Sequence, residues 1–290
     1  MIRARITGTG SYAPERVMTN ADLEKLVATS DEWIRERTGI RERRIAAEGQ
    51  ACSDLGLIAA ERALKAAGIS ADELDMILLA TCTGDMPLPS TACLLQHRLG
   101  ATRAAACDVS AACGFVYALG VADAYIRTGM RHILVVGSEV MSTITDWTDR
   151  NTCILFGDGA GAAVVSASEG ERGVLSTHLH SDGSLSDLIV VPGGGTRIPP
   201  SEAMVSERSQ YIKMKGNETF KVAVRTLEEV ARETLAAHHL SVDELDVYIP
   251  HQANLRIIKA VADRLNLPLE KVVLNTDRYG NTSAASIPIA

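Results

Sequence analysis

A six-residue pattern occurs twice in this chain of 290 residues and constrains its fold more than any other feature. The pattern S-x-D-E-L-D spans residues 70–75 and returns 171 residues later, at 241–246. In both copies a long helical segment precedes the pattern, and the serine is suited to cap a short helical turn. An apolar strand, a second helix and a further strand follow in both. A chance match of this cap-and-acid pattern is the alternative, but the shared order of flanking elements favours an internal duplication.

Apolar periodicity indicates that helices and strands alternate along both copies. It predicts helices over residues 53–67, 91–99, 114–128, 215–237 and 254–265. Apolar runs predict strands over residues 1–12, 75–81, 104–109, 132–137, 159–166, 245–250 and 272–275. Such alternation is typical of α/β layered folds. We therefore expect two α/β halves, 1–166 and 167–290, with a Gly-, Pro- and Ser-rich loop at 191–208.

The two halves differ in the length of chain that follows their second strand. In the first half, 58 residues lie between Asp108 and the end of the following strand at Ser166. In the second half, only 14 residues follow Thr276. The repeat thus predicts that the second half lacks its last helix and two strands, and that the chain is incomplete at its C-terminus.

Composition argues against several classes of protein. The formal net charge is −7 and no basic stripe is evident, which does not favour a nucleic-acid-binding protein. No run approaches 18 apolar residues, and the N-terminus lacks a signal-peptide pattern. The six cysteines include no C-x-x-C pair, so we expect neither a metal site nor a disulfide framework. These features fit a cytoplasmic protein without a metal or organic cofactor.

The best candidate nucleophile is Cys113, in the segment DVSAACGF between a predicted strand and a predicted helix. The partial positive charge at a helix N-terminus lowers the pKa of a thiol and favours the reactive thiolate. Gly114 would let a substrate approach closely. The alternative is that Cys113 is a small buried apolar residue, which is how we interpret Cys107 within the strand.

Two further polar side chains follow strands in the second half. His251 comes directly after the apolar run VYIP, and Asn281 follows the next predicted strand. Functional groups in α/β proteins gather at the carboxyl ends of strands. A lone histidine is more often structural, but Cys113, His251 and Asn281 all fall at the same side of the sheet. We therefore expect the three to form one site.

The glycines of FGDGAGA, at positions 157, 159 and 161, superficially suggest a dinucleotide-binding loop. A strand follows them rather than a helix. Without a helix N-terminus the phosphate would lose its main binding partner. We therefore do not expect a nucleotide loop here.

The segments DVSAAC with GF, IPHQANLRII and DRYGNTSAAS resemble the three active-site segments of β-ketoacyl-acyl-carrier-protein synthase III. SDEWIRERTGIRER and FGDGAGAAV also resemble that family, and the similarity extends over essentially the whole chain. The resemblance implies a homodimer with a thiolase-like fold of duplicated α/β/α/β/α layers. It also implies a decarboxylative condensation of a short acyl-coenzyme A, acetyl-coenzyme A above all, with malonyl-acyl-carrier protein, the initiating step of fatty acid synthesis.

The resemblance assigns roles to individual residues. Cys113 would carry the acyl group, and His251 and Asn281 would stabilise the enolate formed when malonyl-acyl-carrier protein loses carbon dioxide. The residues that would bind coenzyme A and its pantetheine arm are Trp33, Arg37, Arg150 and Asn254. Leu88 would bound the acyl pocket at the dimer interface. Contacts with the acidic carrier protein would come from Lys221, Arg256 and Lys259, for which a solvated helix face is an equally good interpretation.

The sequence departs from the family in two places. One residue fewer separates Cys113 from Gly-Phe than the family has, which would rotate the following helix by about 100°. The resemblance also implies a C-terminal tail with a Gly-rich oxyanion loop, which we expect this chain to lack. Two alternatives therefore stand beside the main hypothesis: a related condensing enzyme of a secondary-metabolite pathway, and a catalytically inert homologue that binds carrier protein.

Overall fold

In the computed structural model, which describes residues 2–111 and 113–290, both copies of the repeated pattern adopt the same local structure. Ser70 and Ser241 each precede a 3₁₀ turn, η1 (Ala71–Glu73) and η4 (Val242–Glu244). The carboxylate of Glu73 or Glu244 accepts the backbone N–H of its serine at 2.8 Å in both copies. This reciprocal capping box fixes the chain direction into the segment that follows. The repeated pattern thus folds alike at both places in the chain.

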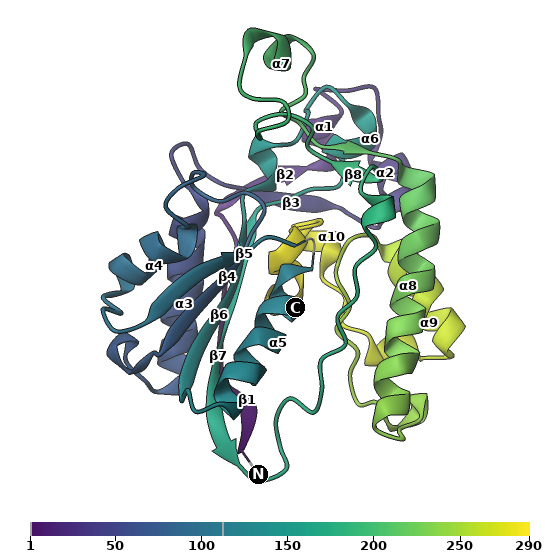
Figure 1. Cartoon of the computed structure of the whole chain (residues 1–290). Coiled ribbons are helices and arrows are strands. Elements are labelled where there is room, and N and C mark those ends of the chain that lie inside the picture. Colours follow the sequence, from purple (N-terminus) through teal and green to yellow (C-terminus); the bar gives the residue numbers. More distant parts are fainter. Residues whose placement is uncertain (1, 112) are drawn as a thin grey trace.

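A five-stranded sheet forms the centre of the first half (Figure 1). Its strand order is β1 (Ile2–Tyr12), β7 (Gly159–Glu169), β6 (His132–Glu139), β4 (Met76–Ala80) and β5 (Ala105–Val109). The strand β4 runs parallel to β5 and β6, whereas β7 is antiparallel to β6 and β1. The strand β5 therefore lies at one edge of the sheet, and the carboxyl ends of β4, β5 and β6 point the same way.

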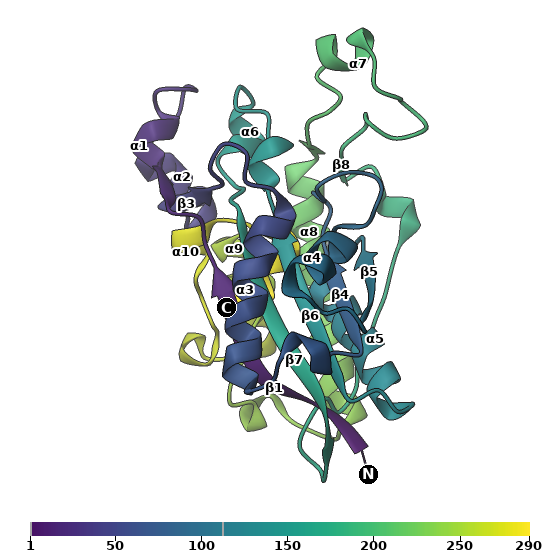
Figure 2. The ribbon, with the colours of Figure 1, turned by 90° about the vertical axis from the view of Figure 1, so that its left-hand side faces the viewer.

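Helices cover both faces of this sheet, as the alternation of strands and helices predicted. Figure 2 shows α3 (Cys52–Ala67) and α4 (Thr91–Leu99) in front of one face, while α5 (Gly114–Arg127) covers the other. Successive residues of a strand point to opposite faces. Accordingly, Ile77 and Leu79 of β4 pack in the core on the α3 side, and Leu78 packs on the α5 side.

The second half is built on α8 (Gly216–Ala237) and α9 (Leu255–Leu265), which pack against each other. They bury a separate apolar core that includes Val224, Ile258 and Val261. The strands predicted over 245–250 and 272–275 are wrong as regular strands, because the two segments meet only in a parallel bridge between Tyr248 and Val272. Among the described residues, no further strand pairs beside this bridge, so the two segments do not form a sheet. The division of the chain at residue 166 stays a prediction.

The remaining helices and strands are short. They are a hairpin of β2 (Arg16–Thr19) and β3 (Glu42–Ile45), the helices α1 (Asn20–Leu23), α2 (Asp31–Thr38), α6 (Arg150–Cys153), α7 (Glu202–Ser206), α10 (Thr276–Tyr279) and α11 (Ser286–Ile289), and the short strands β8 (Ile189–Val190) and β9 (Lys213–Met214). The predicted loop over 191–208 projects from the molecule and contains the single helical turn of α7 (Figure 1). Among the described residues, no helix combines the length and the apolar character needed to cross a membrane.

Glycines of β6 and β7 let the last turns of the chain lie directly on the sheet. A Cβ at Gly161 would come within 2.6 Å of the backbone of Pro288, and one at Gly137 would collide with the carbonyl oxygen of Ala284. These contacts bring η6 (Ser283–Ala285) and α11 against the sheet of the first half. The glycines of FGDGAGA therefore serve strand packing, and Gly159 and Gly161 lie within β7 as expected.

Candidate functional site

Cys113 lies where the sequence places it, at the join between β5 and α5. It is the N-cap residue of α5, which begins at Gly114, and its carbonyl oxygen accepts the N–H of Val116 at 3.1 Å. Gly114 packs closely on the sheet, since a Cβ there would lie 2.9 Å from the Cβ of Ala80 in β4. A larger residue would push the start of α5 away from the sheet. Ala112, in the same motif, lies outside the described residues.

The proton affinity of the Cys113 thiol differs from the sequence expectation. Burial raises the pKa of the thiol, whereas the helix N-terminus was expected to lower it. The expectation was wrong because it weighed the helix dipole and ignored the loss of solvent around the sulfur. The residue as a whole is half-buried.

His251 follows the Tyr248 bridge and is held by the start of α11. Its Nδ1 lies 2.6 Å from the hydroxyl oxygen of Ser286. The same oxygen accepts the backbone N–H of Gln252 at 3.3 Å. Burial lowers the pKa of His251 to about 4, so the imidazole is neutral at neutral pH.

Asn281 lies in the turn between α10 and η6. Its backbone N–H donates to the carbonyl oxygen of Leu155 at 2.8 Å, and its carbonyl oxygen accepts the N–H of Gly157 at 3.1 Å. Its side-chain Oδ1 accepts the N–H of Ser283 at 2.9 Å. Backbone and side chain are therefore both fixed by neighbours.

The segments that carry these three residues converge on η6. The helix α5, which starts beside Cys113, contacts η6, which directly follows the Asn281 turn. Ser286, the residue after η6, holds His251. In Figure 1 this region lies at the carboxyl ends of the parallel strands, near the start of α5. The structure thus brings the three predicted segments together at one end of the sheet.

A second group of predicted residues surrounds Trp33 on α2. The guanidinium carbon of Arg150 lies 3.7 Å from the centroid of the indole, and that of Arg37 lies 4.9 Å from it. Asn254 donates its Nδ2 hydrogen to the carbonyl oxygen of Arg37 at 3.1 Å. The result is a flat, positively charged aromatic site of a kind that suits a nucleotide base and its phosphates.

The remaining predicted residues are exposed. Leu88 is 84% exposed in the loop before α4. Lys221 lies on α8, and Arg256 and Lys259 share a face of α9 because they are three residues apart. The guanidinium of Arg256 lies 5.5 Å from the ring of Phe220, which joins the two helices at this surface.

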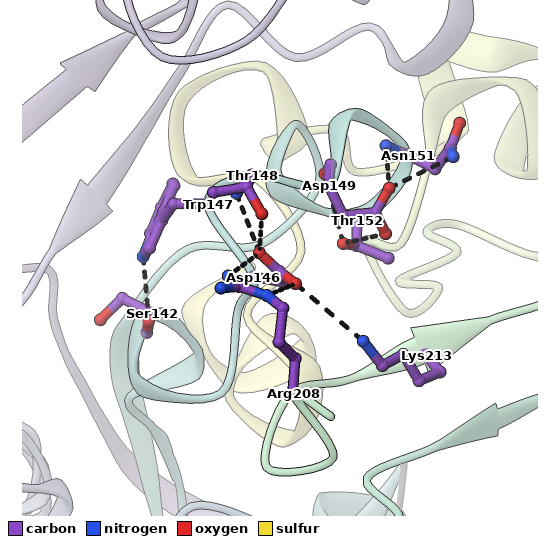
Figure 3. A network of polar contacts seen from close by, with 9 residues as sticks. All are labelled: Ser142, Asp146, Trp147, Thr148, Asp149, Asn151, Thr152, Arg208 and Lys213. Carbon is purple, nitrogen blue, oxygen red and sulfur yellow. Dashed lines mark hydrogen bonds and ion pairs between the residues drawn. The ribbon is translucent and has the colours of Figure 1, made fainter. Parts of the chain in front are cut away.

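Sequence reasoning missed a polar network that anchors the projecting loop (Figure 3). The buried carboxylate of Asp146 accepts the Nε of Arg208 at 2.7 Å and the backbone N–H of Thr148 at 2.9 Å. The hydrogen bond from Arg208 is the main reason why the pKa of Asp146 is held well below its usual range. Arg208 and Asp146 are 62 residues apart, so no local pattern announces the pair.

The described residues offer no group of three or more His, Cys, Asp or Glu side chains arranged to hold a metal ion. Glu139 and Ser286 are two further polar residues near η6 that the sequence did not single out.

Comparisons with known proteins point to one family. The family of 3-oxoacyl-[acyl-carrier-protein] synthase III matches residues 107–183, and its C-terminal family matches residues 235–290. The β-ketoacyl-[acyl-carrier-protein] synthase III of Alkalilimnicola ehrlichii is 57% identical over 294 residues, which cover 100% of this chain and 90% of that protein.

Solved structures show the same similarity. The 3-oxoacyl-[acyl-carrier-protein] synthase III of Aquifex aeolicus is 49% identical, with a TM-score of 0.90 over 99% of this chain and 88% of that chain. The priming β-ketosynthase of the R1128 polyketide biosynthetic pathway is 36% identical, with a TM-score of 0.88 over 99% of this chain and 86% of that chain. The fold is therefore the thiolase-like fold of these enzymes, and the chain belongs to the β-ketoacyl-acyl-carrier-protein synthase III family, the condensing acyltransferases that initiate fatty acid synthesis.

Proposed function

We propose that Cys113 accepts a short acyl group from acyl-coenzyme A and that the enzyme condenses it with malonyl-acyl-carrier protein. In the first step the Cys113 sulfur attacks the thioester carbon, the thiol proton leaves, and coenzyme A departs as its thiol. In the second step the malonyl group loses carbon dioxide and its electron pair forms a thioester enolate. The enolate carbon attacks the acyl carbon, a carbon–carbon bond forms, and the bond to the Cys113 sulfur breaks.

The observation that carries this proposal is the orientation of His251 and Asn281. The hydroxyl oxygen of Ser286 accepts the N–H of Gln252 and lies 2.6 Å from Nδ1 of His251, and we propose the tautomer in which Nδ1 accepts the Ser286 hydroxyl proton. The proton of the neutral imidazole then lies on Nε2. Likewise, the N–H of Ser283 can only donate, which fixes Oδ1 of Asn281 as the acceptor and leaves its Nδ2 hydrogens to point elsewhere. Both side chains can therefore donate to the enolate oxygen as charge develops there.

Two surfaces of this chain suit the two carriers of the substrates, coenzyme A and the acyl-carrier protein. The adenine and phosphates of coenzyme A fit the site formed by Trp33, Arg37 and Arg150, with Asn254 beside the pantetheine arm. Lys221, Arg256 and Lys259 give α8 and α9 exposed positive charges that would attract an acidic carrier protein.

The edge strand β5 supports a homodimer. An edge strand presents unpaired N–H and C=O groups, and proteins normally cover or protect them. Here Ala105 and Cys107 are exposed on β5, and β5 pairs only with β4 among the described strands. A second copy of the chain would cover this edge and the neighbouring Leu88, which is consistent with an acyl pocket completed across the interface. All six cysteines are free thiols, which fits a cytoplasmic enzyme.

Intact-mass measurement after incubation with acetyl-coenzyme A tests the proposal. We expect an increase of about 42 Da, one acetyl group, that is absent in Cys113→Ala. Addition of malonyl-acyl-carrier protein should then remove the adduct and yield acetoacetyl-acyl-carrier protein. Carrier-protein binding without any adduct would instead identify an inert homologue.

A second candidate is a priming enzyme of a secondary-metabolite pathway, which the similarity to the R1128 ketosynthase favours. It would use the same three residues and prefer another acyl group. A panel of acyl-coenzyme A donors from two to eight carbons separates the candidates, because the initiating enzyme should turn over the acetyl donor fastest.

A further inference from the structure

Glu139 is a fully buried carboxylate at the carboxyl end of β6. Among residues 2–111 and 113–290, no Lys, Arg or His forms an ion pair with it. Burial of a charge without a counter-ion is costly unless hydrogen-bond donors surround it. Five donor groups do so here: the hydroxyls of Thr81 and Thr83, the backbone N–H and thiol of Cys82, and the backbone N–H of Ala284.

The directions of these hydrogen bonds are fixed. The Thr83 hydroxyl accepts the N–H of Val140 at 2.8 Å, and the Thr81 hydroxyl accepts the N–H of Thr83 at 3.0 Å. Both hydroxyl protons are therefore directed at Glu139. A backbone N–H can only donate, so both oxygens of Glu139 must act as acceptors. A glutamine of the same shape would place its NH₂ group against other donors.

Glu139 connects the end of β4 to the turn that carries Asn281. Its Oε1 accepts the Ala284 N–H at 3.4 Å from η6, while Oε2 holds Thr81 at 3.1 Å. Gly137, two residues earlier on the same face of β6, makes room for the carbonyl oxygen of Ala284. The two positions together dock η6 on β6, and η6 in turn holds the Asn281 side chain through Ser283.

We infer that Glu139 is a positioning residue for the decarboxylation and condensation step, acting on Asn281 through η6. This inference rests on the proposed function. The contacts of Glu139 reach η6 and the end of β4, and none of its hydrogen bonds involves Cys113. Loss of the acceptor should therefore misplace the Asn281 amide while the acylation of Cys113 proceeds.

The two steps can be measured separately in Glu139→Gln. Acylation is followed by mass after mixing with acetyl-coenzyme A, and condensation is followed as the isolated acetyl-enzyme decays on addition of malonyl-acyl-carrier protein. We expect condensation to slow by about 100-fold, as misplacement by a fraction of an ångström can produce. Acylation should change by less than about 3-fold, because Cys113 keeps its surroundings.

Asp75→Asn is the matched control, because Asp75 joins the same two strands at their opposite end. Its carboxylate accepts the N–H groups of Arg131 at 2.6 Å and His132 at 3.0 Å, beside the start of β4. Both steps should stay near the wild-type rates in this variant. If Glu139→Gln slows both steps equally, or slows neither, the inference is wrong.

A wild-type enzyme that forms no acetyl adduct would instead overturn the proposed function, so the two failures are distinguishable. If Glu139→Gln does not fold, Thr83→Val serves in its place, since it removes one donor and keeps the carboxylate. The same separation of the two rates, smaller in size, is then expected, and an equal loss in both steps counts against the inference.

Discussion

At the scale of single residues, the loss of solvent around Cys113 and His251 favours the uncharged form of both side chains. Burial raises the pKa of the thiol and lowers that of the imidazole to about 4. The first effect favours the protonated thiol over the thiolate. The second leaves the imidazole neutral at neutral pH, as the proposed role of His251 as a hydrogen-bond donor assumes.

The pKa of His251 has a consequence for stability. The unfolded chain has a histidine pKa near 6.5, whereas the folded value is about 4, so the unfolded state binds more protons between these values. The free energy of unfolding should therefore fall as the pH drops from about 6.5 to 4, with His251 contributing as much as about 3 kcal/mol. Urea unfolding of wild type and His251→Asn over this range checks the prediction. The variant should show a weaker pH dependence, and an unchanged slope would contradict the assignment.

At the scale of elements, close backbone contact joins the last turns of the chain to β6 and β7. Glycines at 137, 159 and 161 make that contact possible, and so determine where Asn281 and Ser286 lie. The packing is tight enough that a single methyl group would displace the turn or the strand.

Gly161→Ala tests this packing. Its Cβ would lie 2.6 Å from the backbone of Pro288, so α11 must move. Overpacking of this kind costs about 1–3 kcal/mol, and we expect a matching loss in the free energy of unfolding together with slower condensation. Gly183→Ala is the control, because a Cβ there would meet nothing within 4 Å. Equal stability of the two variants would show that α11 does not rest on β7 as described.

Much of the element structure could be predicted from the sequence, because local patterns govern it. The helix over 91–99 matches α4 at both ends, and the serine caps of the repeat form as expected. The strands predicted in the second half were wrong as regular strands. An apolar run shows that a segment is able to pair as a strand, but it does not show whether a neighbouring strand is present to extend the pairing.

For the site, too, local patterns could be predicted from the sequence and long-range contacts could not. Cys113, His251 and Asn281 were predicted because each follows a predicted strand, and their joint catalytic role stays a prediction. Glu139 and Ser286 could not be predicted, because their contacts with Ala284 and His251 span 145 and 35 residues and exist only in the folded chain.

At the scale of the whole molecule, the exposed edge of β5 is the best candidate for a dimer interface. Its central residue, Cys107, is exposed, and so is Leu88 in the loop before α4. A two-fold dimer would pair identical surfaces, so one edge strand can meet its own copy.

Cys107→Lys tests this interface. A lysine on an edge strand opposes pairing with another strand, so we expect this variant to be a monomer and the wild type to be the proposed dimer. Leu269→Lys, which places the same charge at an exposed position in the second half, should leave the dimer intact. Sedimentation velocity distinguishes the two masses. A Cys107→Lys protein that remains dimeric would place the interface elsewhere.

The stacking of Arg150 on Trp33 also has a consequence for tryptophan fluorescence. The chain has only two tryptophans, Trp33 and Trp147, and both pack against the same apolar cluster above the sheet. Tryptophan fluorescence from this protein therefore originates in one small region and reports little on the rest of the molecule. A ligand that binds between the Trp33 indole and its guanidinium neighbours should therefore change the intensity or the wavelength of tryptophan fluorescence, without any added dye.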